Sequence, residues 1–252
     1  MKNIIVIGSG FSSISAATDL AQKGHKVTIL EKNLTPGGRA RSFSESGFTF
    51  DMGPSWYWMP DVFERYFKKY NKSPEDYYQL IRLDPSYKII FGNDDFIDIP
   101  AEIIKLYEIF ESLEPGSGNR LNKFLEQAQY KYNVGINNLV YKPGRSIKEY
   151  LSIQLLVDLF RLDVLQSFHS HIRKYFTHIK LLQIMEFPVL FLGAVPKNTP
   201  ALYSLMNYAD IKLGTWYPMG GMYKIVEGMV ALAQSLGVKF NFDEEVKKNK
   251  NH

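Results

Sequence analysis

Two glycines and an acid near the N-terminus have the spacing of a dinucleotide-binding site. Gly8 and Gly10 directly follow the apolar run Asn3–Ile7, and Glu31 lies about twenty residues further on. Gly8 would permit a tight turn, and Gly10 would let a pyrophosphate approach the backbone. A helix starting at Ser12 would direct free N–H groups at that anion. An acid at Glu31 would bond the hydroxyls of the adenosine ribose.

These residues need a β-strand, a helix and a second strand to position them. Asn3–Ile7 is predicted to be a strand buried on both faces, because it is apolar throughout. Residues 12–23 are predicted to be a helix that ends at Gly24, and residues 26–30 the second strand. Ser13 stands where the third glycine of the fingerprint is expected, and a small Ser suits that position. The expected cofactor contacts here are Gly8, Ser9, Gly10, Phe11, Ser12, Ser13, Glu31 and Lys32.

A second glycine-rich segment follows the acid. The paired glycines Gly37 and Gly38 would let the backbone run beside the cofactor, and Arg39 would place a cation near its diphosphate. Residues 41–50 then suggest a short hairpin around Glu45-Ser46-Gly47. The expected cofactor contacts in this segment are Gly37, Gly38, Arg39, Ala40, Met52 and Gly53.

This order of motifs resembles that of FAD-dependent amine oxidases and carotenoid desaturases. A second block supports the resemblance, since TPALYS at 199–204 and GTWYPMGGM at 214–222 are similar to the phytoene desaturase pattern. The resemblance extends over residues 1–246 and implies FAD rather than NAD as the cofactor. It also implies an enzyme of carotenoid biosynthesis that desaturates phytoene or a related linear polyene. A related carotenoid isomerase or retinol saturase, or a non-catalytic nucleotide-binding remnant, stays open as an alternative.

The expected fold class is α/β, with a discontinuous Rossmann-like FAD-binding domain and an inserted, mainly helical substrate or lid region. We assign residues 1–75 and 215–252 to the FAD-binding domain and residues 76–214 to the inserted region. Within it, the pattern predicts strands at 80–83, 88–91 and 96–99, and helices at 101–113, 120–139 and within 146–186. Two more elements, a helix at 223–236 and a strand at 238–242, would return to the cofactor domain.

The family resemblance also implies a C-terminal half beyond residue 246. We therefore expect this chain to lack the part that closes over the isoalloxazine, and a separate chain to be a possible carrier of it. No catalytic acid or base is assigned, because the stretch 175–182 lacks the acid and the arginine that some relatives carry.

The composition of the chain excludes some classes of binding site and partner. The 252 residues contain no cysteine, which excludes disulfides and thiolate metal sites, and the net charge of +4 is too small to argue for nucleic acid. Residues 142–182 combine basic residues with Leu and Phe, so they could lie on an anionic membrane surface or form core helices with a solvated basic face. The predicted location is cytoplasmic, peripheral at the inner face of a membrane. His169, His171 and His178 are interpreted as surface or helix-end residues, with no metal site.

Overall fold

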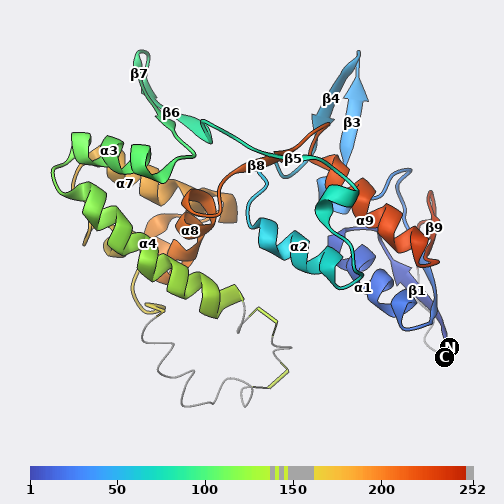
Figure 1. Ribbon diagram of the computed structural model, residues 1–252. Helices are drawn as coiled ribbons and strands as arrows, with labels where there is room; N and C mark the ends of the chain where they lie inside the picture. Colours follow the sequence, from blue (N-terminus) through green and yellow to red (C-terminus); the bar gives the residue numbers. More distant parts are fainter. Residues whose placement is uncertain (137–139, 142–144, 147–161, 248–252) are drawn as a thin grey trace. The chain divides into compact units, whose positions relative to one another are not determined.

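The computed structural model describes residues 1–136, 140–141, 145–146 and 162–247. The chain divides into two compact units (Figure 1). The first consists of Met1–Ile81 with Trp216–His252, and the second of Arg82–Thr215. Each unit is described by itself.

A three-stranded parallel sheet organises the first unit. Its strands are β1 (Asn3–Ile7), β2 (Lys26–Leu30) and β9 (Lys239–Asn241), in the order β1-β2-β9. Helix α1 (Phe11–Gln22) connects β1 to β2, and α9 (Tyr223–Ser235) leads into β9. Two distant parts of the chain therefore build one sheet, which confirms the predicted α/β class.

The core of this unit lies between the sheet and the two helices, which pack against each other. Ile14 on α1 and Val226 on α9 are fully buried, together with Ile29 at the centre of β2. Because side chains alternate along a strand, the residues that face the helices are Ile4, Val6, Val27, Ile29 and Phe240.

The prediction that Asn3–Ile7 is buried on both faces is wrong. Ile5 is 66% exposed and Ile7 is 57% exposed. Both point away from α1 and α9, which cover the same face of the sheet, and no described residue of this unit buries them on the other face. The apolar run correctly predicts a strand. It does not predict whether one or both faces of the sheet are buried, because that depends on which helices pack on each face.

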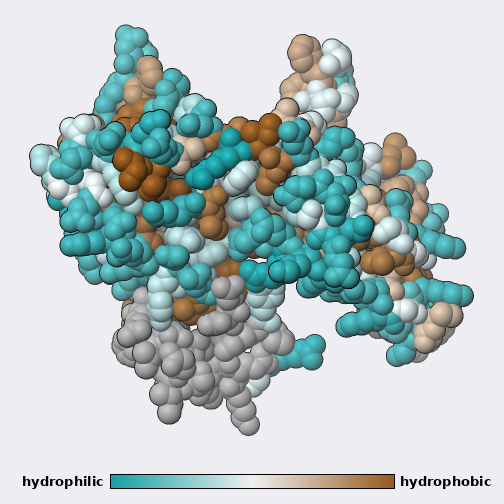
Figure 2. Space-filling view, in the orientation of Figure 1, coloured by the Kyte–Doolittle hydropathy of each residue, from teal (hydrophilic) through white to brown (hydrophobic). Residues whose placement is uncertain are grey.

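A hairpin and a helix follow β2 in the first unit. The hairpin consists of β3 (Ser42–Glu45) and β4 (Phe48–Asp51), as the turn residues predict. Phe43 and Phe50 stack on each other and stay about half exposed, and Figure 2 shows hydrophobic colour along this hairpin at the upper right. Further on lie α2 (Pro60–Lys68), the short helix η2 (Pro74–Asp76) and the paired strands β5 (Leu80–Arg82) and β8 (Trp216–Pro218).

Helices form most of the second unit. Its hairpin pairs β6 (Tyr87–Gly92) with β7 (Asp95–Ile99). The helices in its described part are α3 (Ile103–Leu113), α4 (Ser117–Val134), α6 (Phe168–Ile172), α7 (Ile179–Glu186) and α8 (Leu205–Ile211), with short turns η5 (Phe187–Leu192), η6 (Pro196–Asn198) and η7 (Ala201–Ser204). Phe110, Phe124 and Phe168 are completely buried in its core. Helix α4 begins three residues before the predicted start at residue 120. The last residues of the predicted range, 137–139, lie outside the described part.

Much of the basic segment 142–182 lies outside the described residues. In the part that is described, Leu162, Phe168 and Phe176 are buried in the protein, whereas Leu165 and Ile179 are strongly exposed. Buried apolar side chains beside the exposed Arg173 and Lys174 are the arrangement expected for core helices with a solvated basic face. Of the two interpretations given for His171, the structure supports the helix-end one, because the residue lies in the last turn of α6 and is buried. Within the described ranges, no helix has the length and hydrophobicity to cross a bilayer.

Candidate cofactor site

The turn after β1 brings the backbone close to an open space. Gly8 has a φ of +86°, a left-handed conformation that favours glycine, and its N–H donates to the carbonyl of Leu30 at 2.8 Å. Gly10 caps α1 with an ordinary extended conformation, φ −74° and ψ 172°. A Cβ at Gly10 would have no atom within 4 Å. The absence of a side chain at Gly10 therefore keeps a space open and is not required by packing.

The start of α1 offers backbone donors to that space. Among the described residues, no side chain caps this helix end. The first N–H groups of a helix have no partner inside the helix, and the helix dipole makes them attractive to an anion. Phe11, Ser12 and Ser13 line the cavity in front of them.

Glu31 is held rigidly at the end of β2. Its Oε2 accepts hydrogen bonds from the backbone N–H of Ser9 at 2.8 Å and from the Ser9 hydroxyl at 2.7 Å. Its Oε1 accepts the backbone N–H of Asn33 at 2.9 Å and the Asn33 side-chain amide. Burial opposes ionisation of Glu31, but these hydrogen bonds outweigh it and hold its pKa below the usual value. Glu31 is thus an ionised acceptor, tied to the glycine turn.

The segment around Gly37 packs directly on this turn. The N–H of Gly37 donates to the carbonyl of Ser9 at 2.8 Å, and a Cβ at Gly38 would lie 3.2 Å from the Cα of Gly10. The backbone of Gly53 packs directly against that of Arg39, since a Cβ at Gly53 would lie 2.0 Å from the carbonyl oxygen of Arg39. Residues from three separate segments therefore form one closely packed backbone surface.

Two cavities meet at this surface and share Gly10. The first, of about 440 Å³, contains Gly8, Ser9, Gly10, Glu31, Lys32 and Gly38. The second, of about 600 Å³, contains Gly10, Phe11, Ser12, Ser13, Gly37, Arg39, Ala40 and Gly53. Of the residues named from the sequence, only Met52 lines neither cavity, and its side chain is 54% exposed.

Sequence reasoning missed several residues that line the first cavity. Asn33 helps to hold Glu31, while Glu244 and Glu245 reach the same cavity from the segment after β9. The N–H of Glu244 donates to the carbonyl of Glu31 at 2.9 Å. Asn33 lies only two residues after the predicted acid, whereas the role of Glu244 depends on β9 pairing with β2.

The arrangement fits a dinucleotide joined by a diphosphate. An ionised acid lies in one cavity, a cation at Arg39 lies in the other, and an uncapped helix start lies where they meet. An acid suits ribose hydroxyl donors, and backbone N–H groups with an arginine suit phosphate oxygens. The open space beside Gly10 is the observation that supports this fit most directly.

Comparison with protein families gives one match over most of the chain. The model of the family described as flavin containing amine oxidoreductase matches residues 12–249.

Three curated relatives of this chain are named as desaturases. The chain is 41% identical over 246 residues to a carotenoid 3,4-desaturase of Haloarcula japonica. It is 34% identical over 243 residues to a 4,4'-diapophytoene desaturase of Staphylococcus aureus, and 32% identical over 247 residues to a zeta-carotene-forming phytoene desaturase of Myxococcus xanthus. These alignments cover 96–98% of this chain but only 48–50% of each relative. The chain therefore spans about half the length of the curated relatives it matches.

Solved structures support the fold. An oxidoreductase from Methanosarcina mazei matches with a TM-score of 0.57 at 17% identity, over 96% of this chain and 51% of that protein. A putrescine oxidase with redesigned cofactor binding matches with a TM-score of 0.56 at 13% identity, over the same shares. At such identities the likeness concerns the fold alone.

Proposed function

The chain belongs to the flavin-containing amine oxidoreductase family, and from this premise we propose that it is part of an FAD-dependent desaturase of carotenoid biosynthesis. The proposed substrate is phytoene or a related linear polyene. The relatives at 32–41% identity, all of which are named as desaturases of such compounds, support this choice. The backbone surface around Gly10 is the structural observation on which the proposal depends.

In this proposal the first unit holds the adenosine diphosphate part of FAD. Glu31 accepts hydrogen bonds from the ribose hydroxyls, beside Lys32. The turn from Gly8 to Ser13 and the segment from Gly37 to Ala40, with Gly53 behind it, receive the diphosphate. Bound FAD would supply the hydride acceptor, and the protein would supply position and exclusion of water. We assign this role to residues 1–75 and 215–252, and the substrate or lid role to residues 76–214.

A linear polyene has no polar group for recognition. Its site must therefore be apolar, and the substrate must arrive from the membrane in which it dissolves. We accordingly propose a cytoplasmic protein that binds peripherally at the inner face of a membrane. Since the relatives are twice as long, we also propose that turnover needs a C-terminal part such as theirs, whether on the same chain or on a separate one.

The cofactor proposal is tested by titrating the purified 252-residue chain with FAD, ADP and NAD. We expect FAD to bind, ADP to compete with it, and Gly10→Val to abolish both while the chain stays folded. Thr49→Val, which also introduces a valine but at an exposed position of β4 outside both cavities, is the control. Binding of NAD without any flavin would contradict the proposal.

Product analysis separates the competing reactions. A desaturase removes hydrogen pairs from the polyene, an isomerase leaves its mass unchanged, and a saturase adds hydrogen. Mass spectrometry of products formed from phytoene, by the chain together with a C-terminal part, distinguishes the three. Conversion of phytoene by the 252-residue chain alone would contradict the proposed need for the second part.

A further inference from the structure

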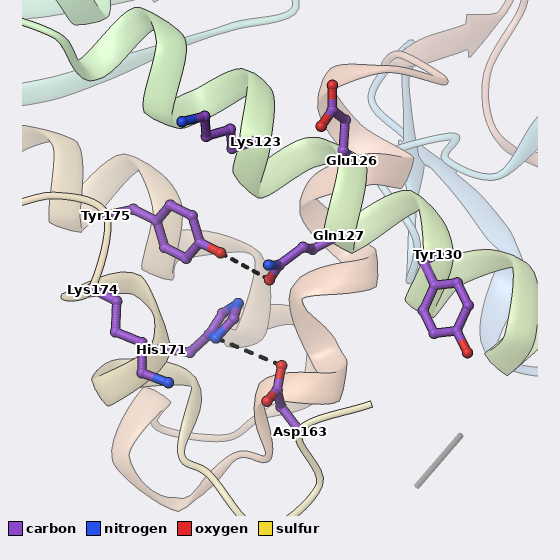
Figure 3. A pocket seen from close by; sticks show the side chains of 8 residues that line it. All are labelled: Lys123, Glu126, Gln127, Tyr130, Asp163, His171, Lys174 and Tyr175. Carbon is purple, nitrogen blue, oxygen red and sulfur yellow. Dashed lines mark hydrogen bonds and ion pairs between the residues drawn. The ribbon is translucent and has the colours of Figure 1, made fainter. Parts of the chain in front are cut away.

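One cavity of the second unit is lined by none of the residues proposed to contact the cofactor. It measures about 760 Å³ and lies against one side of α4 and the turn after α6 (Figure 3). Lys123 and Gln127 reach it from α4, and Lys174 and Tyr175 from the segment after α6. Asp163 and His171 also line it.

A buried lysine behind the cavity fixes the chemistry of His171. Lys131 is only 1% exposed, and its Nζ lies 2.8 Å from Asp163 Oδ2 and 3.2 Å from the carbonyl oxygen of Ala201. The same Nζ lies 3.4 Å from Nε2 of His171. Burial lowers the pKa of Lys131, and the contact with Asp163 opposes that shift. In its charged form Lys131 can only donate, so its contact with Nε2 requires the lone pair on that nitrogen. A neutral His171 therefore carries its hydrogen on Nδ1.

His171 remains neutral over the physiological range. Burial, together with the positive charge of Lys131, lowers its pKa to about 4. The charged groups around the ring are Lys131, Asp163 and Lys174. The ring itself is held between Phe124 and Tyr175, with centroid distances of 5.5 Å to each.

The Nδ1–H group is left without an acceptor among the described residues. Its nitrogen is fully buried and lies 3.9 Å from Asp163 Oδ2, which is beyond hydrogen-bond distance. Asp163 is already the partner of Lys131. A buried donor without a partner is costly, so an acceptor atom that enters the cavity and meets Nδ1 gains a contact that the protein does not supply itself.

The charges around the cavity favour an anion. The charge of Asp163 is balanced by Lys131, which leaves Lys123 and Lys174 against the single carboxylate of Glu126. That carboxylate already accepts a hydrogen bond from Asn122 at 2.9 Å. The lining thus combines two exposed ammonium groups with one buried neutral donor.

We propose that this cavity binds an oxyanion, a carboxylate or phosphate group of a small molecule, whose oxygen accepts the Nδ1–H of His171 while Lys174 pairs with its charge. Lys123 supports the charge from the opposite wall. The site is independent of the dinucleotide site, because its residues all belong to the second unit.

Nitrogen NMR of the 252-residue chain with labelled histidine tests the proposal at pH 7.5, with inorganic phosphate and acetate as probes. His171→Phe identifies the resonances of His171. We expect a protonated Nδ1, an unprotonated Nε2, and a saturable shift of Nδ1 with either probe at constant ionic strength set by chloride. Saturation by phosphate alone or acetate alone identifies which oxyanion the cavity takes.

Variants of exposed lysines test the charge contact. Lys174→Gln should weaken the affinity for the probe about tenfold. Lys197→Gln, the same change in charge elsewhere on the second unit, should leave it unaltered. Gly10→Val should also leave it unaltered, because that residue belongs to the dinucleotide site.

Three results would overturn the proposal. The first is a His171 hydrogen on Nε2. The second is a response to phosphate and acetate no larger than that to chloride. The third is a probe affinity that Lys174→Gln leaves unchanged or that Gly10→Val removes.

Discussion

The carboxylate of Asp51 caps the helix that begins after Met222, although the two residues are 171 positions apart. Asp51 Oδ2 accepts the N–H of Met222 at 2.9 Å, and Oδ1 accepts the N–H of Tyr223 at 3.2 Å. Gly221, with a φ of +107°, passes beside this carboxylate, and a Cβ there would lie 3.5 Å from Oδ2. Asp51, at the end of β4, therefore holds the turn at Gly220-Gly221 through a helix start that favours negative charge.

Removing this long-range cap should destabilise the first unit. We expect Asp51→Ala to lower the free energy of unfolding by about 1–2 kcal/mol, because two N–H groups at the start of α9 lose their acceptor. Urea unfolding measures the change. Glu45→Ala, at an exposed acid of the preceding strand, is the control and should cost less than about 0.5 kcal/mol. Equal effects of both variants would show that the cap contributes nothing specific.

Gly10 and Gly53 should respond in opposite ways to the same substitution. Gly10→Ala adds a methyl group to open space, so we expect unchanged stability and weaker FAD binding. Gly53→Ala forces the added carbon against the carbonyl of Arg39, so we expect a loss of about 1–3 kcal/mol in stability. Unfolding curves and FAD titrations of the two variants provide the comparison. A fully stable Gly53→Ala chain would contradict the close approach of Arg39.

The lowered pKa of Glu31 predicts that the free energy of unfolding decreases in acid. A carboxylate whose pKa is lowered in the folded state stabilises the protein above its unfolded pKa, here 4.5, and that stability is lost as pH falls through the lower folded value. Glu31→Gln should therefore flatten the decrease in unfolding free energy below pH 4.5. It should also weaken FAD binding at neutral pH, since an amide replaces an ionised acceptor. If Glu31→Gln leaves this decrease in unfolding free energy unchanged, Glu31 is not held as described.

Asp210 and His171 should give opposite pH dependences in the second unit. Burial raises the pKa of Asp210 to about 6, against hydrogen bonds from Tyr87 and Thr215, while burial lowers that of His171 to about 4. Ionisation of Asp210 should lower the free energy of unfolding as pH rises from 3.8 to about 6. Loss of the proton that His171 binds in the unfolded chain should raise that free energy as pH rises from about 4 to 6.5. Each change amounts to about 3 kcal/mol.

Single variants should separate these two effects. Asp210→Asn leaves the His171 contribution, so stability should rise with pH between 4 and 6.5. His171→Gln leaves the Asp210 contribution, so stability should fall over nearly the same range. Urea midpoints measured at several pH values give the slopes. Slopes of the same sign in both variants would contradict the assigned protonation states.

The residues of the candidate cofactor site could be proposed from the sequence because their order is local. Gly8, Gly10 and Glu31 belong to one continuous strand, helix and strand, so the short apolar run and the glycine positions indicate both the elements and the turn that joins them. The hairpin around Gly47 and the helix after Met222 were predictable for the same reason. Their signals lie within a few residues of the elements that they specify.

Tertiary structure alone decided which distant residues meet. The exposure of Ile5 and Ile7 depends on α1 and α9 covering the same face of the sheet, which no alternation within β1 can show. The contact of Asp51 with Met222, and the burial of His171 against Lys131, join segments that carry no mark of each other in the sequence. Burial and hydrogen bonding between such segments depend on packing in three dimensions, whereas periodicity and turn chemistry act along the chain.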